Sequence, residues 1–202
     1  MTREPLDPNI FGPDSPCFGC APAHPTGFHL RFARSGDEVT TTFVPHEQLQ
    51  GPPGIMHGGL VTTLADEIAA WTVIGLLERF GFTAALSAKL HRPIRIGAEV
   101  EGIGRVTSST PRIVKVDVTL NQHGERAYSG DFTFALLDES GAERLLGGPL
   151  PEAWKRFARE SRVGQATSSE ARPAGAAPTR LGAPEAHASK QSRVGGGHGQ
   201  NG

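Results

Sequence analysis

The run at residues 54–80, GIMHGGLVTTLADEIAAWTVIGLLERF, limits the possible folds more than any other part of this sequence. It predicts one long helix. The apolar side chains of that helix point in nearly all directions, and they are Leu60, Val61, Leu64, Ile68, Trp71, Val73, Ile74 and Leu77. A helix that is apolar nearly all round must be surrounded by protein. Because the adjacent carboxylates Asp66 and Glu67 interrupt the run, we expect a central core helix and not a membrane span.

Short segments that alternate apolar and polar residues, or are rich in β-branched residues, flank this helix and predict strands. Two precede it at 27–34 and 38–45, and four follow it at 82–94, 98–109, 112–122 and 126–138. The connections are too short for crossover helices, which favours one mostly antiparallel sheet. The predicted fold class is therefore α+β, with a curved sheet wrapped around the central helix. A short amphipathic helix at 151–159 is expected to close the domain.

The two ends of the chain differ in composition from the central domain, which we expect at 27–160. Residues 1–26 are rich in proline and lack a periodic pattern, which predicts an extended leader. Residues 161–202 contain no aromatic residue and no isoleucine. Such a segment cannot bury enough surface to offset its ordering entropy, so we expect a disordered tail.

Charge and the N-terminal sequence exclude several classes of partner. The formal net charge of -1 at pH 7 gives no electrostatic argument for nucleic acid. The first residues contain no apolar core before a small-residue cleavage site, so no secretory signal is expected. We expect a cytoplasmic protein with neither a nucleic-acid nor a membrane partner.

Cys17 and Cys20 form a C-x-x-C pair in the leader. Such a pair can be a redox dithiol or half of a zinc site. A structural zinc needs two further ligands, but the sequence has no second C-x-x-C, and the spacing of His24 and His29 matches no standard zinc finger. The simpler interpretation is two reduced, partly buried thiols.

His57, Gly58 and Gly59 stand at the first turn of the predicted helix, after a Pro-Pro-Gly turn. The first N–H groups of a helix lack internal partners, and the helix dipole favours negative charge there. Glycines also remove the side chains that would block a ligand. This arrangement can present a backbone N–H to a developing oxyanion. The alternative is an ordinary helix start.

Asp66 lies on a stripe of small and hydroxylated residues that includes Thr62 and Thr63. A carboxylate kept from bulk water has a raised pKa and can act as a general base or a nucleophile. Glu67 projects about 100° further round the helix, toward Trp71. The alternative for this pair of carboxylates is a buried ion pair or a subunit contact.

These residues resemble the signature of hotdog-fold acyl-CoA thioesterases of the PaaI and THEM4-like group. That signature has His-Gly-Gly with an Asp nine residues after the His, as His57 and Asp66 are here. It also has a Thr or Ser at the start of the next strand, ten residues before a Pro, which Thr83 and Pro93 match. The opening CFGCAPAHPTGFHLRF also looks like the THEM4-like branch. The resemblance covers roughly residues 17–150.

The resemblance implies a hotdog fold, a homodimer or homotetramer with active sites at the dimer interface, and hydrolysis of an acyl-CoA or acyl-carrier thioester. It implies that Asp66, from the opposite subunit, is the base or nucleophile. The Gly59 N–H, together with Gly58, would polarise the carbonyl. Thr83 would hold the attacking water, and His57 would contact the thioester or order the turn. No metal or redox cofactor is implied.

Four more residues are expected to bind the substrate. Gln50 would contact it from the loop before the helix, and Glu67 from the helix itself. Arg92 and Arg95 could meet the phosphates of CoA, because guanidinium pairs well with phosphate, although solvated strand ends are an alternative. Two other functions stay open: a hotdog hydratase or dehydratase, and a non-catalytic acyl-binding module. The spacing of His before Asp favours the thioesterase.

Overall fold

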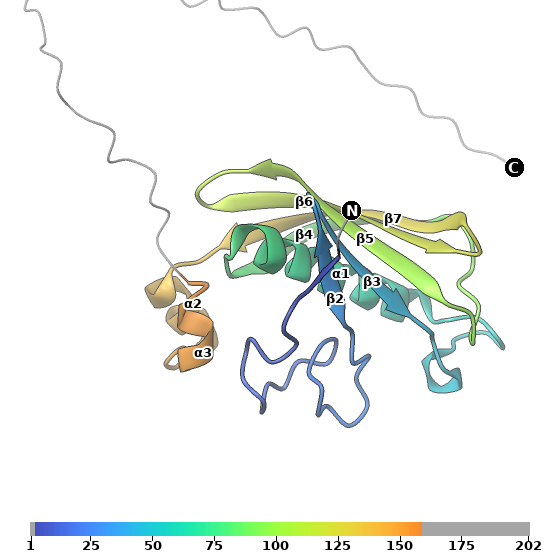
Figure 1. The fold of residues 1–202 in the computed structure, drawn as a ribbon, viewed down its shortest axis with the longest axis horizontal. Coiled ribbons are helices and arrows are strands. Elements are labelled where there is room, and N and C mark those ends of the chain that lie inside the picture. The colour runs from blue at the N-terminus through green and yellow to red at the C-terminus, as the bar shows by residue number, and fades with distance from the viewer. Residues whose placement is uncertain (1–2, 159–202) are drawn as a thin grey trace, which may run out of the picture. The chain divides into compact units, whose positions relative to one another are not determined.

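The computed structural model describes residues 3–158, and Figure 1 shows their arrangement. This part of the chain holds one seven-stranded antiparallel sheet in the order β1-β2-β3-β5-β6-β7-β4. The strands are β1 (Glu4–Pro5), β2 (Phe32–Ser35), β3 (Glu38–Phe43), β4 (Gly81–Leu90), β5 (Val100–Ser109), β6 (Ile113–Gln122) and β7 (Glu125–Leu136). The helices are the 3-10 turn η1 (Glu47–Leu49), α1 (Gly58–Leu77), α2 (Glu139–Leu146) and α3 (Glu152–Lys155). The tail expected at 161–202 lies outside the described residues.

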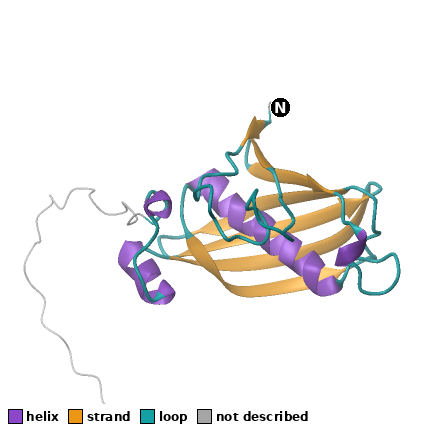
Figure 2. Ribbon diagram, turned by 90° about the horizontal axis from the view of Figure 1, so that it is seen from below, coloured by secondary structure: helices purple, strands orange, loops and turns teal. Residues whose placement is uncertain are grey.

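Helix α1 lies across one face of the sheet, as Figure 2 shows. Its Leu64 and Ile68 side chains are completely buried, and so are Val114 and Leu120 on β6. The core is therefore the layer between this helix and the inner face of the curved sheet. The predicted fold class, an antiparallel sheet around a long central helix, is confirmed.

By length and mean hydropathy alone, α1 could cross a membrane, because it has 20 residues and a mean hydropathy of 1.5. From the sequence, Asp66 and Glu67 are expected to make this helix too polar to cross a membrane. By length and hydropathy that expectation is wrong. In the fold, the helix packs on the sheet as a core helix. That packing accounts for its apolar composition.

Two glycines of β5 allow α1 to lie unusually close to the sheet. A Cβ atom on Gly104 would lie 2.0 Å from Thr72 Oγ1, and one on Gly102 would lie 2.3 Å from Ile68 Cδ1. Thr72 is itself fully buried, and its hydroxyl donates to the Ile68 carbonyl at 2.7 Å. The separation of helix and strand therefore leaves no room for a side chain at either glycine.

Some element boundaries differ from those predicted. Strand β2 begins at Phe32 and not at residue 27, because His29 has a left-handed backbone, with φ of 53°, which interrupts an extended chain. Helix α2 was not predicted. Its first turn is capped by Asp138, which accepts from the Gly141 N–H at 2.7 Å, and Gly147 ends it with φ of 70°.

Residues 3–26, expected as an extended leader, fold as a series of turns against the domain. Strand β1 pairs with β2, and Cys20 is buried in the main core. Further along, the Trp154 indole N–H donates to the Phe11 carbonyl at 3.1 Å. The leader is thus part of the same compact unit as the sheet.

Candidate active site

The start of α1 is held by backbone hydrogen bonds to two other segments. The His57 N–H donates to the Leu49 carbonyl at 2.9 Å, and the Met56 N–H donates to the Ile94 carbonyl at 2.9 Å. Ile55 also forms an isolated bridge with Arg95. The helix entrance is therefore fixed between the loop that precedes it and the segment that follows β4.

His57 is the N-cap of α1, and its Nδ1 accepts the Gly59 N–H at 3.1 Å. The Gly59 donor predicted for an oxyanion is thus used by the helix cap. Among the described residues, the Gly58 N–H has no hydrogen-bond partner. Leu90 of β4 lies beside it, since a Cβ on Gly58 would be 3.3 Å from Leu90 Cδ2. The Gly58 N–H is therefore an open donor at the helix start, whereas the Gly59 N–H is not.

Asp66 and Thr83 are brought together within one chain. The Thr83 hydroxyl donates to Asp66 Oδ1 at 2.7 Å. Thr83 lies at the irregularity in the β4–β7 pairing, where the register shifts between Thr83 and Ala85. Such β-bulges re-aim side chains and are common beside active sites. Here the bulge lies next to the residue that meets the helix carboxylate.

Burial raises the pKa of Asp66 above its usual range, and the hydrogen bond from Thr83 opposes part of that rise. A carboxylate with a raised pKa is a stronger base once it is ionised, which suits proton abstraction near neutral pH. Asp66 is only partly buried, so water can still reach it.

Sequence reasoning missed Tyr128, which reads as an ordinary aromatic residue of a strand. It lies on β7 and is fully buried. Burial raises the pKa of Tyr128 to about 12, a side-chain hydrogen bond with Thr62 opposes part of that rise, and the negative charge of Asp66 adds to it. The Asp66 carboxylate therefore has a neutral phenol nearby in the core.

Three of the residues predicted to bind substrate, Gln50, Arg92 and Arg95, each have a partner within the chain. Gln50 Oε1 accepts the Gly54 N–H at 3.0 Å and so stabilises the turn before the helix. Arg92 forms an ion pair with Glu125, and both side chains are more than half exposed. The exposed Arg95 is held through its backbone next to the helix entrance. The predicted roles of Gln50, Arg92 and Arg95 in substrate binding stay predictions.

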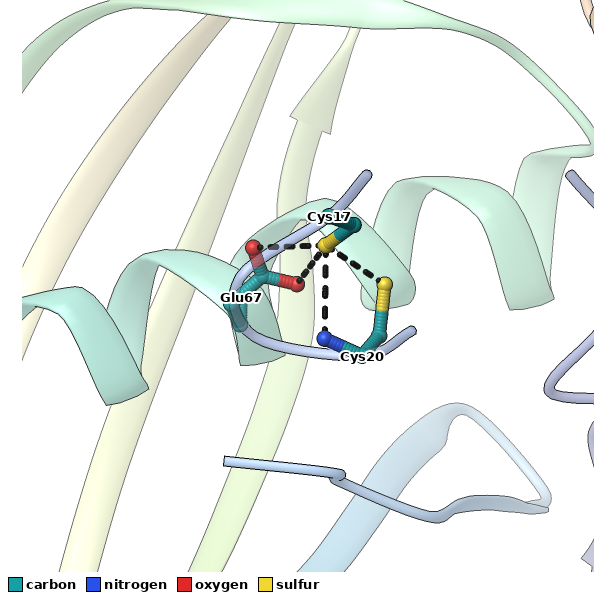
Figure 3. A group of neighbouring side chains, drawn as sticks. All are labelled: Cys17, Cys20 and Glu67. Carbon is teal, nitrogen blue, oxygen red and sulfur yellow. Dashed lines mark hydrogen bonds between the residues drawn. The ribbon is translucent and has the colours of Figure 1, made fainter. Parts of the chain in front are cut away.

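Glu67 faces the leader, where Figure 3 shows its carboxyl group beside Cys17 and Cys20. Cys17 Sγ lies within hydrogen-bond distance of the two Glu67 carboxyl oxygens, at 3.4 and 3.6 Å. Cys20 Sγ lies 2.7 Å from Cys17 Sγ, and both cysteines are free. Burial raises the pKa of Glu67 to about 8, whereas the Cys20 hydrogen bond is the main cause that lowers the pKa of Cys17 to about 5. The predicted substrate contact at Glu67 thus belongs to a separate cluster in this structure.

A family model, the thioesterase superfamily, matches residues 53–127, which include His57, Asp66 and Thr83. No curated protein matches the sequence. Solved structures resemble the fold at low sequence identity. A thioesterase superfamily protein has a TM-score of 0.57 and 22% identity, over 67% of this chain and 68% of that chain.

Two further structures extend this likeness. Zebra fish thioesterase superfamily member 2 has a TM-score of 0.52 and 19% identity, over 57% of this chain and 89% of that chain. A hypothetical thioesterase from Streptococcus pneumoniae, solved with coenzyme A, has a TM-score of 0.50 and 20% identity, over 53% of this chain and 87% of that chain. At these identities the likeness establishes the shared fold.

Proposed function

Residues 53–127 belong to the thioesterase superfamily and the described chain has its hotdog fold; on this premise we propose that the protein hydrolyses acyl-CoA or acyl-carrier thioesters. The observation that carries the proposal is the hydrogen bond between Thr83 and the partly buried Asp66. It gives a carboxylate of raised pKa a fixed orientation, as a general base requires. We assign the protein to the PaaI and THEM4-like group and to the cytoplasm on its sequence features.

In this proposal, the thioester carbonyl lies against the start of α1. The Gly58 N–H, which has no partner among the described residues, donates to the carbonyl oxygen as negative charge develops on it. The positive end of the helix dipole favours the same charge. His57 keeps this turn in shape by capping the Gly59 N–H.

Asp66 acts as the general base. Thr83 donates to its Oδ1, so Oδ2 is left to accept a proton from water. The water oxygen bonds to the acyl carbon, the carbon–sulfur bond breaks, and the proton passes from Asp66 to the departing thiolate. The products are a free acid and a thiol.

One chain alone cannot bring these groups to the same carbonyl. Asp66 follows Gly58 by eight residues on one helix, which corresponds to a rise of about 12 Å along its axis. An oxyanion donor and a base must each approach the reacting group to within about 3 Å. We therefore propose a homodimer in which Gly58 of one chain meets Asp66 of the other, and a homotetramer would pair such dimers.

Strand β4 is the edge that we propose for this pairing. Among the strands of residues 3–158 it pairs only with β7, and its residues from Ala84 to Leu90 are exposed in the single chain. Leu86 and Leu90 are 48% and 55% exposed. A long edge strand with exposed apolar side chains is a template for pairing with another chain.

Replacing Leu86 with Lys therefore weakens dimerisation, because a charge is placed on the proposed edge. Size-exclusion chromatography with light scattering measures the effect. We expect the mass of two or four chains for the wild type, and a shift toward one chain on dilution of the Leu86→Lys variant. Leu145→Lys, at a 58% exposed leucine of α2, is the matched control. A monomeric wild type would contradict the dimer.

The activity itself is tested with short, medium, long and aryl acyl-CoAs, by measuring free thiol release from each. We expect hydrolysis of at least one member of this panel, which would also identify the acyl class. An enoyl-CoA belongs in the same experiment, with its hydration followed separately. If no thioester is cleaved and the enoyl-CoA is hydrated, the protein is a hydratase and the proposal is wrong.

A further inference from the structure

The C-x-x-C loop of the leader closes over the middle of α1. Figure 3 shows Cys17, Cys20 and Glu67 converging from these two elements. One ligand atom from each lies within 4.8 Å of the other two. Cys20 is 4% exposed, and the others are partly buried. Two sulfur atoms from residues three positions apart thus share one site with a carboxylate that lies 50 residues after Cys17.

The loop is built to fit this position. A Cβ atom on Gly19 would lie 2.1 Å from Glu67 Cγ, so only glycine allows the loop to lie against that side chain. The Ala21 N–H donates to the Cys17 carbonyl at 3.1 Å, and the Leu30 N–H donates to the Gly19 carbonyl at 3.0 Å. The Cys20 N–H also donates to Cys17 Sγ at 3.3 Å, which favours a thiolate there. The three side chains are therefore held together by the backbone.

A disulfide fits this cluster poorly. Joining Cys17 to Cys20 would replace the Cys17 thiolate, which shares a hydrogen bond with the Glu67 carboxyl, by an uncharged disulfide sulfur. Glu67 would lose that hydrogen bond while its carboxyl stayed largely shielded from water, which costs free energy. A divalent cation, in contrast, would bind both thiolates and the carboxylate and would offset two of their three negative charges.

The distances also suit a small tetrahedral ion. Zinc binds sulfur at about 2.3 Å and a carboxylate oxygen at about 2.1 Å, which places sulfur and oxygen ligands roughly 3.6 Å apart. The Cys17–Glu67 separations of 3.4 and 3.6 Å already match this spacing. The two sulfurs, now 2.7 Å apart, would have to separate by about 1 Å.

We propose that Cys17, Cys20 and Glu67 bind one Zn²⁺ ion, with the fourth coordination position open to the adjoining cavity. All three residues line that cavity, whose volume is about 140 Å³. Ser15 lines it too, and its hydroxyl is buried without a hydrogen-bond partner among the described residues. A water molecule on the ion would be the fourth ligand. Thiolate ligands select zinc over magnesium or calcium.

The ion links the leader to α1 and stabilises the fold, and it takes no part in thioester hydrolysis. The test uses the full chain without a polyhistidine tag, purified under reducing conditions and freed of metal with a chelator. Zn²⁺ is then titrated against a chromophoric competing chelator, and Co²⁺ is added separately to detect a thiolate-to-cobalt absorption band. Neither measurement depends on catalytic activity.

We expect one Zn²⁺ per chain, a cobalt–thiolate band, and a higher melting temperature with Zn²⁺. Cys17→Ser, Cys20→Ser and Glu67→Gln should each weaken zinc binding by at least about tenfold, the lower end of the loss seen when a metal site is perturbed. His24→Gln, which changes another metal-capable residue of the leader outside the cluster, should bind zinc as the wild type does.

The proposal is wrong if the reduced wild-type protein binds Zn²⁺ no more tightly than the Cys17→Ser/Cys20→Ser double variant. It is also wrong if Glu67→Gln binds Zn²⁺ as tightly as the wild type, because the helix would then supply no ligand.

Discussion

The Asp66→Asn variant should hydrolyse thioesters at least about a hundredfold more slowly than the wild type, which is the scale expected for a lost general base. The amide keeps the shape of the side chain and can still accept the Thr83 hydroxyl hydrogen bond through its oxygen. It cannot take a proton from water. Because burial disfavours the charged carboxylate, the neutral amide should leave the melting temperature equal to or above that of the wild type.

The measurement is kcat/KM with the best substrate of the panel, beside a thermal melt of each variant. Asp117→Asn makes the same chemical change at an exposed carboxylate of β6 and should keep full activity. Turnover by Asp66→Asn within a few-fold of the wild type would show that the carboxylate is structural. The binding-module and hydratase functions would then lead.

Gly104→Ala should lower the free energy of unfolding by about 1–3 kcal/mol, the usual range for overpacking a core. The added methyl group would lie 2.0 Å from Thr72 Oγ1 and 3.2 Å from Ile68 Cγ2. Both neighbours belong to the fully buried face of α1. Helix and strand must move apart to relieve the clash, which disturbs the layer that forms the core.

Urea unfolding of Gly104→Ala, Thr72→Ala and the double variant gives a double-mutant cycle. Removing the Thr72 hydroxyl makes room for the new methyl group, so the double variant should be more stable than the sum of the two single effects indicates. Gly148→Ala, where an added Cβ meets nothing within 4 Å, is the control and should change little. Additive effects at Gly104 and Thr72 would contradict the close contact.

The main elements of the fold could be predicted because their patterns are local. The apolar surface of α1 requires cover on all sides, and the strands after it alternate along their own sequences. Strand β1 escaped prediction because it consists of Glu4–Pro5 alone and exists only through its pairing with β2. Helix α2 was missed because it is short and polar on average. The only signals for it in the sequence are the N-cap residue Asp138 and the glycine that ends it, Gly147.

The candidate site was partly within reach of the sequence. Spacing and resemblance selected Asp66 and Thr83, and the structure places them in contact. The hydrogen bond from the Gly59 N–H to His57 Nδ1 depends on the rotamer of His57, which the spacing of residues in the sequence does not determine. The same holds for Glu67, because its partner Cys17 lies 50 residues earlier and meets it only after the leader has folded.

The position of β4 in the chain makes the candidate site depend on a later strand. Strands β5, β6 and β7 follow one another through short turns, so they can pair as soon as each has formed. Strand β4 precedes them in the chain, yet within residues 3–158 its only partner is β7, the last of the described strands to be synthesised. This pairing joins residues 38 to 55 positions apart, and the pairing of β3 with β5 joins residues 57 to 67 positions apart, so both cost more loop-closure entropy than the two hairpins. Thr83 therefore enters the sheet only after β7 is available, so the Asp66–Thr83 contact depends on a strand that follows both residues in the chain.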